Sequence, residues 1–76
     1  MEHLNVCTVE GLVTAIIEDK GMKFVVIQCN GDSIPIRLKT DISINYEDLI
    51  RVVGTLHSTG VIIADHIDVR FAGGLE

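Results

Sequence analysis

Apolar residues recur at every second position in five separate stretches of this 76-residue chain. The stretches run over residues 7–17, 23–29, 33–39, 50–56 and 61–71. A period of two is typical of strands that bury one face, whereas an amphipathic helix repeats every 3.6 residues. The sequence therefore predicts an all-β fold of five strands, and a chain of this length can enclose only one core.

Two turn signals connect the first three predicted strands. The charged and glycine-containing segment 18–21 interrupts the first alternation and predicts a hairpin loop, and Asn30-Gly31-Asp32 is a strong short-hairpin signal. A two-residue loop at either Asn30-Gly31 or Gly31-Asp32 places the same side chains of the second and third strands on one face of the sheet. The shared inward face would contain Val25, Ile27, Cys29, Ile34, Ile36 and Leu38.

Glycines and a change of phase predict irregular strands. Gly11 and Gly54 each lie two residues after a valine inside a predicted strand, and a glycine there suggests a bend or a close backbone approach. In the last strand Ile62 and Ala64 share one parity, whereas the later apolar residues have the other, so we expect a bulge near Asp65. Pro35 predicts an edge or an interruption of pairing in the third strand.

These elements match a small, partly open Greek-key barrel. Residues 40–48 show no clean period and are expected to form a connector before the fourth strand. Tyr46 is expected to close the bottom of the barrel and Phe71 to plug the core. The predicted core comprises Val9, Val13, Val25, Ile27, Ile36, Leu38, Ile50, Val52, Leu56 and Ile67.

Composition limits the possible functions. Hydrophobic residues make up 47% of the chain and there is one proline, which indicates a folded domain. Eleven acidic and six basic residues give a net charge of −5, so only a local basic patch would attract nucleic acid. The apolar runs are far shorter than the ~20 residues of a membrane helix. Residues 1–3 do not resemble the start of a secretory signal, and we expect a cytoplasmic protein without a membrane partner.

Several short motifs resemble the strands of OB-fold nucleic-acid-binding domains, which include archaeal replication protein A and the anticodon-binding domains of class II tRNA synthetases. Residues 47–56 and 61–67 are similar to the fourth and fifth strands of that family, and residues 9–13, 24–27 and 34–36 to its first three. The resemblance covers nearly the whole chain. It implies a five-stranded Greek-key OB-fold barrel.

On this resemblance, residues 1–72 would form a single OB-fold domain and residues 73–76 a disordered tail. Leu75-Glu76 looks like a remnant of an expression vector. Such an ending contributes nothing to the predicted fold.

The resemblance also implies a binding face for single-stranded nucleic acid. OB folds bind their ligands on the second and third strands and on two adjoining loops. Phe24 would stack on a base, and Arg37 and Lys39 would meet phosphates. The predicted site contains Lys20, Lys23, Phe24, Val26, Gln28, Arg37, Lys39, His57, Ser58 and Thr59. Because four of the six basic residues belong to it, it is the best candidate site in the chain.

Other interpretations remain open. Phe24 would instead pack under a loop if the basic residues were an ordinary solvated face. The acidic balance and the few aromatic residues favour a second function, an interaction subunit of a replication or telomere-type complex or a homo-oligomer.

Metal binding and catalysis are not expected. Cys7 and Cys29 are expected to be buried thiols, and no pair among the cysteines and histidines has the short spacing of zinc ligands. The Asp65-His66-x-Asp68 cluster is interpreted as surface charge, because no activated nucleophile accompanies it. We therefore expect neither an enzyme nor a cofactor.

Overall fold

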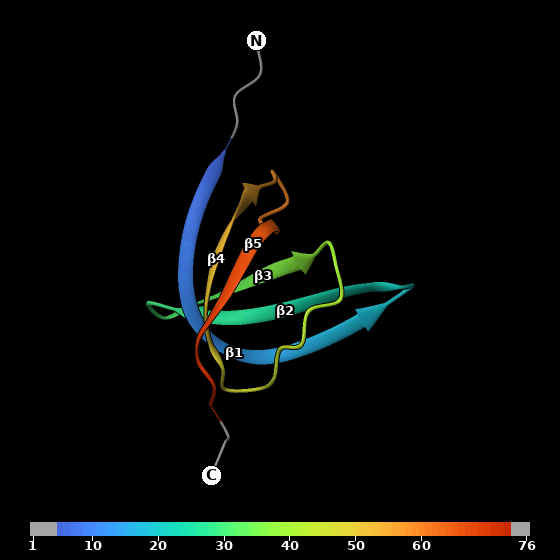
Figure 1. Cartoon of the computed structure of the whole chain (residues 1–76). Coiled ribbons are helices and arrows are strands. Elements are labelled where there is room, and N and C mark those ends of the chain that lie inside the picture. Colours follow the sequence, from blue (N-terminus) through green and yellow to red (C-terminus); the bar gives the residue numbers. More distant parts are fainter. Residues whose placement is uncertain (1–4, 74–76) are drawn as a thin grey trace.

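A computed structural model describes residues 5–73 and shows five strands in one closed sheet (Figure 1). The strands are β1 (Val6–Asp19), β2 (Met22–Cys29), β3 (Asp32–Leu38), β4 (Leu49–Leu56) and β5 (Ile62–Phe71). They form a barrel in the order β1-β2-β3-β5-β4, and β4 pairs back onto β1. This confirms the predicted all-β barrel, while residues 74–76 of the predicted tail lie outside the described residues.

The long strand β1 pairs with two strands and is strongly curved (Figure 1). Its first half pairs with β4, as far as Leu12 opposite Leu49, and its second half pairs with β2 from Leu12 onward. A Cβ atom on Gly11 would stand 2.3 Å from the carbonyl oxygen of Gln28 in β2. The predicted bend is confirmed, and glycine is required there because the two backbones approach so closely.

A bulge in β1 was not visible in the sequence. The register with β2 shifts between Val13 and Ala15. The shift turns Ile16 toward the core and leaves Ile17 48% exposed, although Ile17 has the same parity as the predicted core residue Val13. The pattern hid the bulge because residues 15–17 are all apolar and fit either phase.

The β2–β3 hairpin has the predicted set of side chains on its inward face. Its loop is Asn30-Gly31, and both residues have positive φ, +52° and +86°, as a two-residue type I′ turn requires. Val25 lies opposite Ile36, and both are fully buried. The parity that either loop position implied is therefore confirmed.

Pairing of β3 with β5 is short. The two strands are parallel and pair only at Ile36 with Ile62 and at Arg37 with Ile63. Pro35 immediately precedes this contact and pairs only with Val26 of β2, so of the two predicted alternatives the edge position is confirmed. A proline there leaves no unpaired N–H at the incomplete edge.

The predicted bulge at Asp65 is confirmed. Gly54 pairs with Ala64 and Val53 pairs with His66, which leaves Asp65 as the extra residue of β5. A second irregularity lies near the end of β5. Phe71 is 72% exposed there, so its predicted role as a core plug is wrong.

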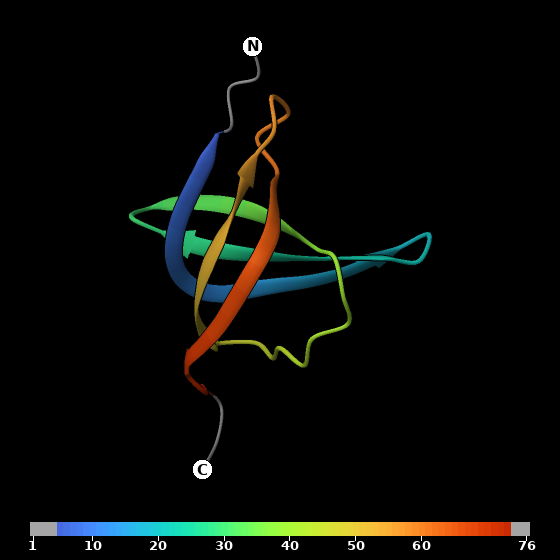
Figure 2. The same ribbon diagram turned by 45° about the horizontal axis from the view of Figure 1, so that its top comes forward.

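The connector between β3 and β4 crosses one end of the barrel (Figure 2). It contains no helix, and its buried residues are Ile44, at 4% exposure, and Asp48, at 3%. Tyr46 is 58% exposed, so Ile44 takes the closing role predicted for Tyr46.

The observed core contains Val13, Val25, Ile27, Ile36, Leu38, Ile44, Ile50, Val52, Ile62 and Ala64. Among the predicted core residues, Val9 and Ile67 are only partly buried, and Leu56 is 41% exposed because it is the last residue of β4. Cys7 and Cys29 are half-buried free thiols rather than fully buried ones. Within residues 5–73 there is no helix that could cross a membrane.

Candidate nucleic-acid interface

The outer face of the β2–β3 hairpin carries side chains that alternate with the core residues. Phe24 lies opposite Arg37, and Val26 lies opposite Pro35. Farther along, Gln28 lies opposite Ser33, whose hydroxyl donates a hydrogen bond to the Gln28 side-chain oxygen at 3.3 Å. The structure therefore brings together Phe24, Val26, Gln28 and Arg37 on one surface, as the strand parity predicts.

Phe24 and Arg37 line a groove of about 230 Å³ against the β4–β5 turn. The turn contributes His57 and Thr59, and the other lining residues are Met22, Val61 and Ile63. The volume lies below the about 300–1,000 Å³ of typical small-molecule pockets. Its chemistry, an aromatic ring beside a guanidinium, suits part of a larger ligand that continues over the surface.

The β4–β5 turn is held by its own backbone. The amide of His57 donates to the carbonyl of Val61, and the amide of Gly60 donates to the carbonyl of His57, each at 2.9 Å. Ser58 is exposed in the same turn but does not line the groove. These bonds fix His57 and Thr59 beside Phe24 and Arg37.

The β1–β2 hairpin projects from the barrel (Figure 1). Lys20 borders a second hollow, of about 500 Å³, which is lined by this hairpin and by the start of the connector. Met22 lines both hollows, so they adjoin. Carboxylates line this one as well: Glu18, Asp19 and Asp41. The second hollow is therefore of mixed charge, and Lys20 stands at its exposed rim.

Lys23 does not share the outer face. It lies opposite Leu38, whose side chain is buried, and only 20% of its own side chain is exposed. Its ammonium donates to the carbonyl of Ile42 at 3.3 Å and lies 3.5 Å from the carboxylate of Asp41. Lys23 thus ties the connector to β2. The predicted site included Lys23 as a residue that flanks the binding face, but neighbouring residues of a strand face opposite ways, so Lys23 and Phe24 lie on different faces.

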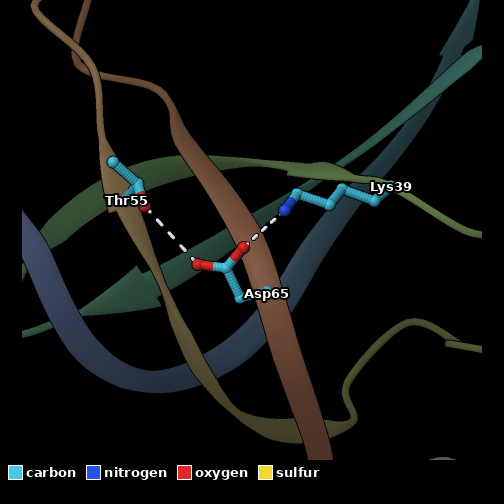
Figure 3. Close-up of polar contacts among 3 residues, drawn as sticks. All are labelled: Lys39, Thr55 and Asp65. Carbon is cyan, nitrogen blue, oxygen red and sulfur yellow. Dashed lines mark hydrogen bonds and ion pairs between the residues drawn. The ribbon is translucent and has the colours of Figure 1, made fainter.

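Lys39 lies beyond the end of β3 and forms an ion pair with Asp65 (Figure 3). Its Nζ is 2.5 Å from Oδ1 of Asp65, while the Thr55 hydroxyl donates to Oδ2 at 3.4 Å. The pKa of Asp65 is lowered, chiefly because Lys39 donates a hydrogen bond to the carboxylate. Both side chains remain partly exposed, 57% for Lys39 and 45% for Asp65.

Five residues of this region were absent from the predicted site: Met22, Thr55, Val61, Ile63 and Asp65. Strand parity is the signal that could have found Met22, which shares a face with Phe24. Asp65, His66 and Asp68 are all exposed, which confirms them as surface charge. No local pattern could show that Asp65 pairs with Lys39, because 26 residues separate them.

The sequence matches no family model and no curated protein. Solved structures are similar in fold. The mitochondrial single-stranded DNA binding protein Rim1 from S. cerevisiae has a TM-score of 0.83 at 10% identity, over 95% of this chain and 100% of Rim1. A ZRD-deleted mutant of TiaS in complex with agmatine has a TM-score of 0.77 at 18% identity, over 93% of this chain and 23% of TiaS.

The S. pombe Stn1–Ten1 complex contains a further similar chain, with a TM-score of 0.73 at 18% identity, over 83% of this chain. The present chain spans only 56% of that neighbour's length and, as given above, less than a quarter of TiaS. At such low identities these similarities concern the fold. Together with the strand order β1-β2-β3-β5-β4 of the closed barrel, they show that the chain has the OB fold.

Proposed function

We propose that this chain binds single-stranded nucleic acid along the groove between the β2–β3 face and the β4–β5 turn. The observation that carries the proposal is the placement of Phe24 directly beside Arg37 in that groove. An aromatic ring offers a stacking surface to any base, and a guanidinium binds phosphate oxygens through paired hydrogen bonds. Both contacts are insensitive to base identity, so recognition would be independent of sequence.

Single-stranded DNA is the ligand that we favour. Its support is the likeness in fold to Rim1, a single-stranded DNA binding protein, over the full length of that chain. The sequence resemblance to replication protein A supports a finer proposal, a replication protein A-like module in DNA replication. With one cation and one ring at the centre of the groove, we expect weak binding whose affinity falls as the salt concentration rises.

Substituting Phe24 with alanine is expected to weaken binding of a labelled oligothymidylate of about 15 nucleotides by ~1–3 kcal/mol, because a base loses its stacking partner. Fluorescence anisotropy measures the change. Phe71→Ala is the matched control, since Phe71 is 72% exposed and lies outside the groove. Equal losses in the two variants would contradict a specific role for Phe24.

Substituting Arg37 with alanine is expected to weaken binding and to make its salt dependence shallower. Losing one phosphate contact to a single strand reduces the slope of log K against log salt by about 0.7, measured between about 50 and 200 mM NaCl. Arg51→Ala removes the same charge from the exposed face of β4, outside the groove, and should leave the slope unchanged. A slope that changes equally in both variants would argue for a general charge effect.

A second candidate function, an interaction subunit, is favoured by an apolar row across β1, β4 and β5. Leu12 lies opposite Leu49, which lies opposite Phe71, and the first and last are 49% and 72% exposed. Exposed apolar surface of this kind often contacts another protein. If the wild type failed to bind oligonucleotide at low salt and sedimented as a dimer that Phe71→Ala dissociates, this second function would replace the first.

A further inference from the structure

We propose that Asp65 is an internal competitor for the phosphates of bound nucleic acid: its carboxylate occupies Lys39 in the free protein and thereby weakens binding in the groove. The inference rests on the proposed function and concerns its regulation. A carboxylate and a phosphate oxygen are alternative anionic partners for one ammonium group. Lys39 can bind a phosphate of the nucleic acid only after its ion pair with Asp65 has broken.

The ion pair continues the row of residues that forms the groove. Arg37 of β3 lies opposite Ile63 of β5, and both line the groove. Lys39 and Asp65 each come two residues later in their strand directions, which are parallel. By this register the pair lies on the same outer face as the groove, and Lys39 itself lines the adjoining second hollow. A nucleic-acid strand that continues from Arg37 along this face would meet the pair.

Asp65 stands in the bulge of β5 and faces Lys39. Because Asp65 is the extra residue between the Gly54–Ala64 and Val53–His66 pairs, both Asp65 and His66 are exposed although they are neighbours in sequence. Bulges often re-aim a side chain in this way. Figure 3 shows the Asp65 carboxylate between the ammonium of Lys39 and the hydroxyl of Thr55, with one oxygen directed to each.

The electrostatics keep this competitor charged. The lowered pKa of Asp65 means that the carboxylate stays ionised at neutral pH. Its stabilising contact is present above the ordinary pKa of an aspartate and is lost only as the pH falls through the lowered value. Lys23 is paired with Asp41 and Lys39 with Asp65. No ion pair within residues 5–73 engages Arg37, the cation that lines the groove.

Asp65→Asn tests the inference by removing the charge at nearly constant side-chain shape, and its single amide oxygen can replace only one of the two acceptor oxygens that Lys39 and Thr55 now use. Affinity for the labelled oligothymidylate is expected to rise about fivefold at about 50 mM NaCl, and the salt slope to steepen by about 0.7, as one more phosphate contact forms. Asp68→Asn is the matched control. It makes the same change in net charge on β5, but Asp68 lies 3.5 Å from His66 and makes no contact with Lys39.

A second substitution separates release of Lys39 from a general loss of negative charge. Adding Lys39→Ala to the Asp65→Asn protein is expected to abolish the gain in affinity and to restore the wild-type salt slope. A gain that survives the loss of Lys39 would overturn the inference. Far-ultraviolet circular dichroism and thermal unfolding verify that each variant has kept the barrel.

The outcomes distinguish this inference from the proposed function. If the wild type binds and Asp65→Asn gains no more than Asp68→Asn, the competition by Asp65 is overturned while the binding function stands. If no protein in the set binds oligonucleotide at low salt, both proposals fall. A larger gain in Asp65→Asn than in Asp68→Asn, lost on removal of Lys39, supports both.

Discussion

Substituting Gly54 with alanine is expected to lower the free energy of unfolding by about 3 kcal/mol or more, because the new methyl group has no space. A Cβ atom at this position would stand 2.3 Å from the carbonyl oxygen of Ile63 and 2.8 Å from Cγ2 of Ile62. The oxygen belongs to the backbone of β5 and cannot retreat without disturbing the β4–β5 pairing. A domain of this size has a total stability of roughly 4–11 kcal/mol, so much of it would be lost.

Urea denaturation followed by circular dichroism measures this loss as a lower midpoint at an unchanged m-value. Gly31→Ala is the matched control. A Cβ atom there meets nothing within 4 Å, and only the left-handed backbone, with φ of +86°, opposes it. That strain is worth about 1–2 kcal/mol. If Gly54→Ala were no more destabilising than Gly31→Ala, the close approach of β4 and β5 would not be what requires glycine.

The two bulges show how far alternation can predict a strand. The bulge at Asp65 was predictable because polar Asp65 and His66 stand side by side and visibly break the period of two. The bulge beside Ala15 was not, because three consecutive apolar residues satisfy both phases. Alternation reports a bulge only where the inserted residue differs in polarity from the residue that it displaces.

The candidate site was predictable to the extent that one hairpin determines it. Phe24 and Arg37 face each other because the turn Asn30-Gly31 sets their register, and both turn and parity can be recognised in the sequence. The partner of Lys39 could not be found in this way. It depends on the parallel contact of β3 with β5, which closes the barrel between segments distant in sequence.

Substituting Asp48 with alanine is expected to lower the free energy of unfolding by about 3 kcal/mol, although no sequence pattern marked this residue. Asp48 is the one buried charged residue within residues 5–73, at 3% exposure. One carboxylate oxygen accepts from the amide of Asn45 at 2.9 Å, and the other accepts from the amide of Gly73 at 3.2 Å. Alanine would leave both amides without this acceptor, and each unsatisfied group costs about 1–3 kcal/mol.

The effect of Asp48→Ala should be local as well as global, because Asp48 joins the connector to the chain just beyond β5. Hydrogen exchange is expected to accelerate first at the amides of Asn45 and Gly73, the two donors that lose their partner. Asp41→Ala makes the same change in net charge in the same connector. Asp41 is 92% exposed and forms only a surface ion pair with Lys23, so its loss should cost less than about 1 kcal/mol. Equal stability of the two variants in urea, with unchanged protection at Asn45 and Gly73, would show that the buried carboxylate does not hold these segments together.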